Sequence, residues 1–264
     1  MKKSFLILAC VVDSACAAPS LYLSAKVGMG RVQPIDYTLD GTFLGETSNV
    51  SGYLDFKYYN REAKESDVPF VTIALGTDLV RLNLQNVRFE TEYSFRNKYT
   101  LSPYTEGVIV NGIIVENHNE HILSEQSQDV GDKIFDIDIK NQILMFNTYY
   151  DFKTNSKFTP YINAGLGISR TKLRAFHFMN LGEDGRAIIE DKSTNFAWAV
   201  GAGINYAVND QASLDFNYRY VDLGDINGEK KYSFSNNTYY QQFKINNSLE
   251  LKSHDFSIGL RYKF

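Results

Sequence analysis

The sequence predicts an all-β protein, an eight-stranded antiparallel up-and-down barrel that crosses a membrane. Eight segments alternate apolar residues with polar or small ones, which is the pattern of strands with two different faces. The spacers between these segments are short and long in turn, as in barrels with tight turns on one side of the membrane and long loops on the other. The last segment, Leu251 to Phe264, has the clearest two-residue period and ends in an aromatic residue.

The first eighteen residues have the features of a secretory signal peptide. Two lysines precede a short apolar run, and small residues follow up to Ala18. The run is much shorter than the roughly 20 residues that a membrane-spanning helix needs. We expect residues 1–18 to be a signal peptide and residues 19–264 to form the barrel. Both cysteines lie in this signal, and Cys16 is in a poor context for lipidation, so we expect no disulfide or cysteine-bound metal.

Each predicted strand repeats its pattern over about ten residues, which lets a tilted strand cross the hydrocarbon layer. The sixth strand shows why a helix is a poor alternative, because Phe196, Trp198 and Val200 alternate with alanine and glycine. A helix would scatter these aromatic residues around its axis and would contain several glycines. In chain order, the predicted strands lie at residues 21–30, 71–79, 87–96, 144–152, 161–169, 196–206, 214–221 and 251–264.

The spacers predict the orientation of the barrel. We expect the short ones to be periplasmic turns and the four long ones to be external loops, with both termini on the periplasmic side. A soluble barrel such as a lipocalin would show the same alternation with its apolar face inward. The signal peptide and the aromatic residues at segment ends favour lipid outside. The short spacers are residues 83–86, 153–157 and 209–211, and the long ones are 32–67, 101–137, 176–193 and 227–250.

Charge is distributed unevenly along the chain. The formal net charge is −4, and the acidic excess lies in the long spacers, while the barrel segments and short turns are basic. An acidic chain of this kind argues against nucleic acid as a partner. The plain interpretation is solvated loops that stay clear of anionic lipopolysaccharide. The alternative is a loop surface that meets a basic partner on a host cell or matrix.

The inward faces of the strands carry charges of both signs. An eight-stranded barrel is just wide enough for side chains to fill it, so these charges are expected to pair with one another. We interpret them as a salt-bridged plug; the alternative is a gate that opens a narrow pore. The proposed lumen charge network consists of Arg88, Glu90, Glu92, Asp215, Arg219, Arg261 and Lys263.

No motif predicts an enzyme, a cofactor or a metal site. His118 and His121 have two residues between them in an acidic spacer, and solvated loop histidines explain them better than a metal site does. Ser253 and His254 are adjacent on a strand, so their side chains point to opposite faces and cannot form a catalytic pair. The Gly-x-Gly pairs lack the lysine and helix of a phosphate loop and are better explained as small inward residues.

The C-terminal half resembles the opacity-type outer-membrane proteins, small eight-stranded barrels related to the barrel domain of outer-membrane protein A. The resembling stretches are TPYINAGLG at 159–167, AVGAGINY at 199–206, LDFNYRYVDLG at 214–224 and SIGLRYKF at 257–264. The resemblance implies an outer-membrane location in a Gram-negative bacterium, surface-exposed loops and roles in adhesion, host contact or antigenic display. It carries over no receptor-binding residue, because the matched stretches belong to the scaffold.

These observations predict a surface antigen or adhesin-like barrel, with a small-solute porin as the alternative and a lipid-modifying enzyme as the weakest one. The expected partners are outer-membrane lipid and lipopolysaccharide, the barrel assembly machinery and a host receptor or matrix protein that the loops contact. Leu260, Tyr262 and Phe264 share one face of the last strand and resemble the C-terminal signal that the assembly machinery recognises.

Overall fold

A computed structural model describes residues 21–47, 50–61, 65–79, 84–102, 104–128, 135–178, 186–235 and 239–264. These ranges hold twelve β-strands, all paired antiparallel. Within the same ranges, no helix has the length and hydropathy needed to cross a membrane. The expected signal peptide, residues 1–18, lies outside the described residues.

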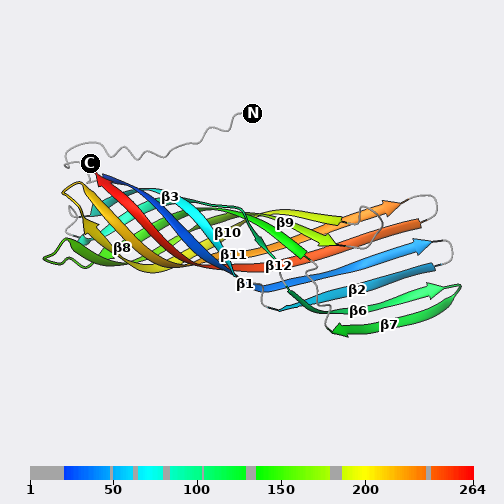
Figure 1. Ribbon diagram of the computed structural model, residues 1–264. Coiled ribbons are helices and arrows are strands. Elements are labelled where there is room, and N and C mark those ends of the chain that lie inside the picture. The colour runs from blue at the N-terminus through cyan, green and yellow to red at the C-terminus, as the bar shows by residue number, and fades with distance from the viewer. Residues whose placement is uncertain are drawn as a thin grey trace, which may run out of the picture.

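Eight of the strands close into a ring, which confirms the predicted antiparallel barrel. Neighbours in chain order pair with each other around the ring, and the last strand returns to the first, with Tyr22 opposite Lys263 (Figure 1). Each predicted segment falls on one ring strand. These strands are β1 (Leu21–Thr47), β3 (Ser66–Leu79), β4 (Leu84–Arg96), β8 (Phe135–Asp151), β9 (Phe158–Phe178), β10 (Arg186–Ala207), β11 (Ala212–Ser235) and β12 (Tyr239–Lys263).

Short turns join ring strands at the end of the barrel where the chain terminates (Figure 1). Residues 152–157 connect β8 to β9, and residues 208–211 connect β10 to β11. In the second turn, Asn209 Oδ1 accepts hydrogen bonds from the backbone N–H groups of Gln211 (2.9 Å) and Ala212 (2.7 Å). An Asn side chain that bonds to the backbone just after it is a common way to form a turn. Two of the predicted short spacers, residues 153–157 and 209–211, therefore lie in turns, whereas residues 84–86 of the third belong to β4 and residue 83 lies outside the described residues.

The expectation that the long spacers are loops is wrong for much of their length. The ring strands continue through them, and β1 pairs with β12 as far as Thr47. Strands β2 (Val50–Arg61), β6 (Tyr104–Glu116) and β7 (Asn119–Gln128) extend the sheet from the outer half of β1, while β5 (Tyr99–Leu101) pairs with β8. Extended pairing satisfies the backbone N–H and C=O groups of these segments, and β6 is rich in β-branched residues, which favour strands.

The outer sheet lies at the far end of the molecule from the C-terminus and is formed by β1, β2, β6 and β7 in that order (Figure 1). A tight hairpin turn joins β6 to β7. Its central residues, Asn117 and His118, both have positive φ angles, 49° and 69°. Two-residue hairpin turns of this kind need positive φ at both positions because their twist then matches that of the strands.

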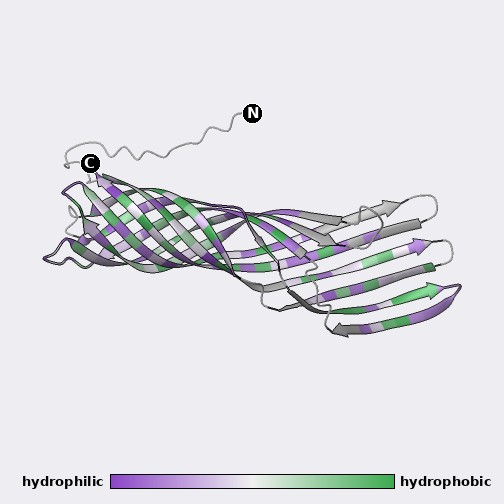
Figure 2. Cartoon of the chain, viewed as in Figure 1, coloured by the Kyte–Doolittle hydropathy of each residue, from purple (hydrophilic) through white to green (hydrophobic). Residues whose placement is uncertain are grey.

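The two faces of the ring strands differ as the alternation predicts. Outward side chains such as Leu166 and Phe256 are 59 % and 60 % exposed, whereas their inward neighbours are mostly buried. Apolar and polar residues alternate along the strands in the half of the molecule that contains the C-terminus (Figure 2). An outward apolar belt of this extent is the expected lipid-facing surface of a transmembrane barrel.

The ring divides into two sheets beyond the apolar belt. Pairing between β10 and β11 ends at Trp198 and Asp222, where β11 has a bulge against β12. Gly224 lies in this bulge with φ at +76°, and its N–H donates to Asp222 Oδ1 at 2.9 Å. Farther out, β11 stays with β12, β1 and the outer sheet, while β10 stays with β9 and β8.

Candidate functional site

One exposed face of the outer sheet carries a row of apolar side chains. The register places Leu44 of β1 opposite Tyr53 of β2, Tyr53 opposite Ile113 of β6, and Ile113 opposite Ile122 of β7. Ile122 is 79 % exposed, Leu44 and Tyr53 are also exposed, and Ile113 is half-buried. We call these four residues the apolar row. Directly opposite residues have Cβ atoms about 4.5–5.5 Å apart, so the row forms a continuous strip across four strands.

Polar side chains border the apolar row on the same face. On one side, Thr42 Oγ1 donates to Asp55 Oδ1 at 2.7 Å, and Ser124 Oγ donates to Asn111 Oδ1 at 3.0 Å. These hydrogen bonds hold the bordering side chains in place. An apolar strip with a polar border on an exposed sheet has the composition of a protein-binding surface.

The histidines of the predicted His-x-x-His spacing lie in the β6–β7 hairpin, His118 in the turn and His121 on β7. Both are exposed. Across the described part of the chain, no group of three His, Cys, Asp or Glu residues is placed to hold a metal ion.

The half of the barrel near the termini encloses a charge network. Lys26 Nζ lies 2.8 Å from Glu90 Oε1 and 3.2 Å from Glu92 Oε2, and Arg219 Nη1 lies 2.7 Å from Glu92 Oε1. All four side chains are at most 6 % exposed. A low-dielectric interior strengthens these attractions but also makes any unpaired charge costly.

Tyrosines connect the other charged residues to this network. The Arg88 guanidinium lies over the ring of Tyr149, 3.7 Å from its centroid, and its Nε is 3.0 Å from Asp151 Oδ2. Tyr149 donates its hydroxyl to Glu90 Oε1 at 3.1 Å. Tyr161 donates to Asp215 Oδ1 at 2.6 Å, leaving Asp215 Oδ2 to accept from Arg261 Nη2 at 3.1 Å.

Lys263 stands apart from the other residues of the proposed network. Its Nζ lies 2.7 Å from Asp78 Oδ2, and the lysine side chain is 45 % exposed at the end of the barrel. The central cation is instead Lys26, which the predicted network does not include. Lys26 is two residues from both Ser24 and Gly28, so all three share the inward face of β1. This spacing is the sequence feature that indicates an inward position for Lys26.

An apolar layer closes the lumen on the outer side of the network. Between the two lies the buried ion pair of Arg96 with Asp255, to which Ser253 also hydrogen-bonds. Ser253 points inward, whereas the adjacent His254 bonds to Tyr218 on the outer face. The apolar layer contains fully buried side chains from five of the described strands, namely Val32, Leu101, Ile137, Ile139, Leu223, Ile226, Leu249 and Leu251.

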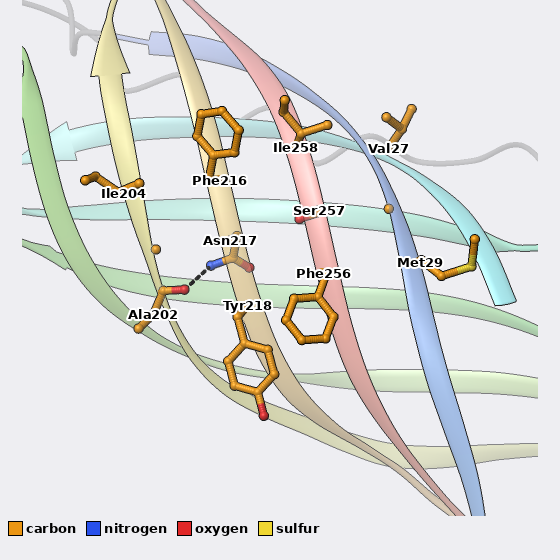
Figure 3. Close-up of a pocket in the computed structure, with 12 residues that line it drawn as sticks. Val27, Met29, Ala202, Ile204, Phe216, Asn217, Tyr218, Phe256, Ser257 and Ile258 are labelled. Carbon is orange, nitrogen blue, oxygen red and sulfur yellow. Dashed lines mark hydrogen bonds between the residues drawn. The ribbon is translucent and has the colours of Figure 1, made fainter. Parts of the chain in front are cut away.

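The outer wall of the barrel has a shallow apolar groove across β10, β11, β12 and β1 (Figure 3). Phe216 and Tyr218 stand beside Phe256 and Ile258, and the small side chain of Ala202 leaves room next to them. All four larger side chains belong to the outward apolar belt. The groove therefore lies on the surface that hydrocarbon chains contact.

The last strand exposes Leu260, Tyr262 and Phe264 on its outer face. The rings of Tyr262 and Phe264 meet edge to face with centroids 5.5 Å apart, and the Phe264 N–H donates to the Leu21 carbonyl at 3.0 Å. The C-terminal residue therefore completes the seam between the first and last strands. Recognition of these residues by the assembly machinery stays a prediction.

The sequence was compared with protein families, curated proteins and solved structures. The family described as the outer membrane protein beta-barrel domain matches residues 41–264. The outer membrane protein PagN of Salmonella typhimurium is 28 % identical over 220 residues, covering 74 % of this chain and 89 % of PagN. The 31 kDa outer-membrane immunogenic protein of Brucella melitensis is 31 % identical over 115 residues, 43 % of this chain and 41 % of that protein. The crystal structure of Neisserial surface protein A aligns over 92 % of this chain and 97 % of that one, with 17 % identity and a TM-score of 0.44.

Proposed function

Because the chain belongs to the outer membrane protein β-barrel family, we propose that it is a surface-exposed binding protein, an antigen or adhesin-like barrel. The protein is located in the outer membrane of a Gram-negative bacterium. Its ring strands cross the lipid, and its outer sheet meets host surfaces or matrix through the apolar row. The role is one of binding rather than catalysis.

The observation that carries this proposal is the exposed apolar row on strands that project past the lipid belt. Surfaces of this kind on soluble parts of proteins commonly mark binding sites, because leaving adjacent apolar side chains in water is unfavourable. The row crosses Leu44, Tyr53, Ile113 and Ile122 on four paired strands, so its shape is set before a partner arrives. A relative that is named as immunogenic agrees with an exposed surface role.

The lumen gives less support to the alternative of a small-solute porin. Charged side chains fill one half of the interior, and fully buried aliphatic side chains fill the other. An ion would have to lose its hydration shell to pass the aliphatic layer, which is costly. The geometry therefore favours a scaffold that holds the outer sheet over a channel.

Substitutions in the apolar row test the proposal. A non-adherent bacterium that displays the protein is measured for attachment to cultured epithelial cells and to immobilised matrix proteins. We expect Tyr53→Lys with Ile122→Lys to abolish attachment, because two charges would be buried at the contact. The matched control is Asn119→Lys with His121→Lys, two exposed residues of β7 on the opposite sheet face to Ile122, which should attach as the unchanged protein does.

Heat-dependent gel migration shows whether each variant folds. Attachment that is equal in folded apolar-row and control variants would rule out the row as the binding surface. A deletion that removes part of the outer sheet should keep Leu101 and Ile137, because both are buried in the apolar layer and contribute to folding. Removing residues 104–128 takes away only β6, β7 and their turn.

A further inference from the structure

A second surface, on the opposite side of the ring division, carries an unusual arrangement of charge. The outward residues of β8, β9 and β10 form successive rows, three strands wide, that run from the lipid belt toward the outer end. The last apolar row is Leu144, Ile168 and Phe196. Two rows farther out, Lys140 lies opposite Lys172, and Lys172 lies opposite Lys192. We call these three lysines the basic row.

The basic row faces outward from the barrel wall. Lys172 is exposed, whereas its neighbours Thr171 and Leu173 are buried in the interior. Lys172 thus shares its face with Ile168, which is 48 % exposed in the lipid belt, and with Arg170 between them. One strand therefore presents apolar, then basic side chains in sequence along a single outward face.

Like charges directly opposite each other on neighbouring strands destabilise a sheet. Within the described residues, no carboxylate lies at ion-pair distance from the side-chain nitrogens of Lys140, Lys172, Lys192 or Arg170. Arg170 adds a fourth positive charge one row closer to the lipid. The cluster therefore concentrates positive charge without compensation from the described part of the chain.

Other basic residues in this border region are compensated. Arg31 Nε lies 3.1 Å from Asp67 Oδ1, and Lys98 Nζ lies 2.6 Å from Asp138 Oδ2. One row beyond the basic row, Arg174 Nε lies 3.1 Å from Glu190 Oε1. Among the described residues of this border region, the uncompensated charge is thus confined to the basic row and Arg170.

We propose that the basic row and Arg170 bind the phosphate groups of a phosphorylated lipid in the outer leaflet, such as the lipid A part of lipopolysaccharide. Successive rows are about 6.6 Å apart along a strand, so the cluster begins one row above the last apolar side chains, at the level of lipid headgroups. The ammonium groups supply point charges, and the Arg170 guanidinium can bind two phosphate oxygens. The acyl chains of the same lipid would lie against Ile168 and Phe196 directly below.

The cationic cluster and the last apolar row of the lipid belt lie on one outward face, and this combination favours a lipid as the ligand. A free anion would use the cations alone and would leave their position beside the lipid belt unexplained. A phosphorylated lipid uses the cationic and apolar rows together. Binding would also remove the mutual repulsion of the three lysines by placing negative charge between them.

The test uses the full barrel folded into zwitterionic phosphatidylcholine vesicles. Phosphorylated lipid A, dephosphorylated lipid A or inorganic phosphate is added, and the midpoint of thermal unfolding is followed by gel migration. Binding of phosphorylated lipid A is titrated in parallel. The variant is Lys140→Gln with Lys172→Gln and Lys192→Gln, and the matched control is Arg31→Gln with Lys98→Gln and Arg174→Gln, which removes three compensated charges from the same region.

We expect phosphorylated lipid A to raise the unfolding midpoint of the unchanged protein and of the control, and dephosphorylated lipid A to have little effect. The basic-row variant should bind phosphorylated lipid A about tenfold more weakly or worse, which corresponds to about 1.4 kcal/mol. Without added lipid A, this variant should unfold at the same temperature as the unchanged protein or higher, because the repulsion is gone.

Three results would overturn the proposal. The first is a midpoint that phosphorylated and dephosphorylated lipid A raise equally, which would leave the phosphates without a role. The second is undiminished binding by the folded basic-row variant. The third is inorganic phosphate stabilising the unchanged protein as much as the lipid does, which would make the cluster a site for free anions.

Discussion

Replacing Glu92 with Gln tests whether the lumen network is as dry and as tightly paired as its geometry indicates. Gln has the shape of Glu but no charge, so the change opens no cavity. Lys26 keeps Glu90 at 2.8 Å, but Arg219 loses the carboxylate at 2.7 Å. A buried charge that loses its partner costs about 3–5 kcal/mol, whereas an exposed ion pair contributes about 0.2–1 kcal/mol. We expect Glu92→Gln to lower the free energy of unfolding by the larger amount.

Urea unfolding in detergent micelles or thin bilayers, followed by tryptophan fluorescence from Trp198 and by gel migration, measures this loss. Glu190→Gln is the control, because its partner Arg174 is half-exposed, and it should cost no more than about 1 kcal/mol. Adding Arg219→Met to Glu92→Gln should recover part of the loss, because the unpaired charge is removed. A loss below about 1 kcal/mol for Glu92→Gln would refute the reasoning and would mean that water screens the network.

Three further predictions concern other parts of the molecule. In planar bilayers, the unchanged protein should show no discrete conductance steps, because the aliphatic layer blocks hydrated ions; regular steps at low voltage would contradict this. Gly224→Ala should lower the free energy of unfolding by about 1–3 kcal/mol, because φ is +76° and a Cβ would lie 2.8 Å from the Phe196 carbonyl oxygen. Equal urea midpoints would show that the bulge relaxes. Burial raises the pKa of Asp138, but hydrogen bonds from Lys98 and Thr100 lower that pKa by more, to below its ordinary value. Its stabilisation is therefore present at neutral pH and is lost as the pH falls through the ordinary carboxyl pKa toward the folded-state pKa. Asp138→Asn should then cost up to about 1 kcal/mol at neutral pH and nothing in strong acid, as measured by urea unfolding at both pH values.

The barrel could be predicted because each strand has one face in lipid and one in the interior. Apolar and polar residues therefore alternate along its sequence with a period of two. The same alternation places Glu90, Glu92 and Arg219 inside the barrel without any knowledge of their partners. Alternation does not say how deep each residue lies along the barrel or which strand faces it. For that reason Lys263 was grouped with charges that it does not reach, and the central role of Lys26 was missed.

The outer sheet and the basic row could not be predicted in this way. Leu44 and Ile122 lie in one row only because three separate strand pairings have matching registers. The register between two distant segments produces no repeating pattern in the sequence of either segment. The long spacers also contain many polar residues, which resemble loop sequence when each segment is considered alone. Their strand structure depends on neighbours that a single segment does not reveal.

The continuity of β1 affects how the protein would respond to tension. The strand runs from the lipid to the outer sheet and pairs with β12 from Tyr22 opposite Lys263 to Thr47 opposite Tyr239. A partner that pulls on the outer sheet would load these hydrogen bonds in shear, all together, because they lie perpendicular to the strands. The edge strand β7 would instead peel away one bond at a time. In single-molecule pulling, we expect β7 to detach well before the β1–β12 seam yields; simultaneous rupture would contradict this.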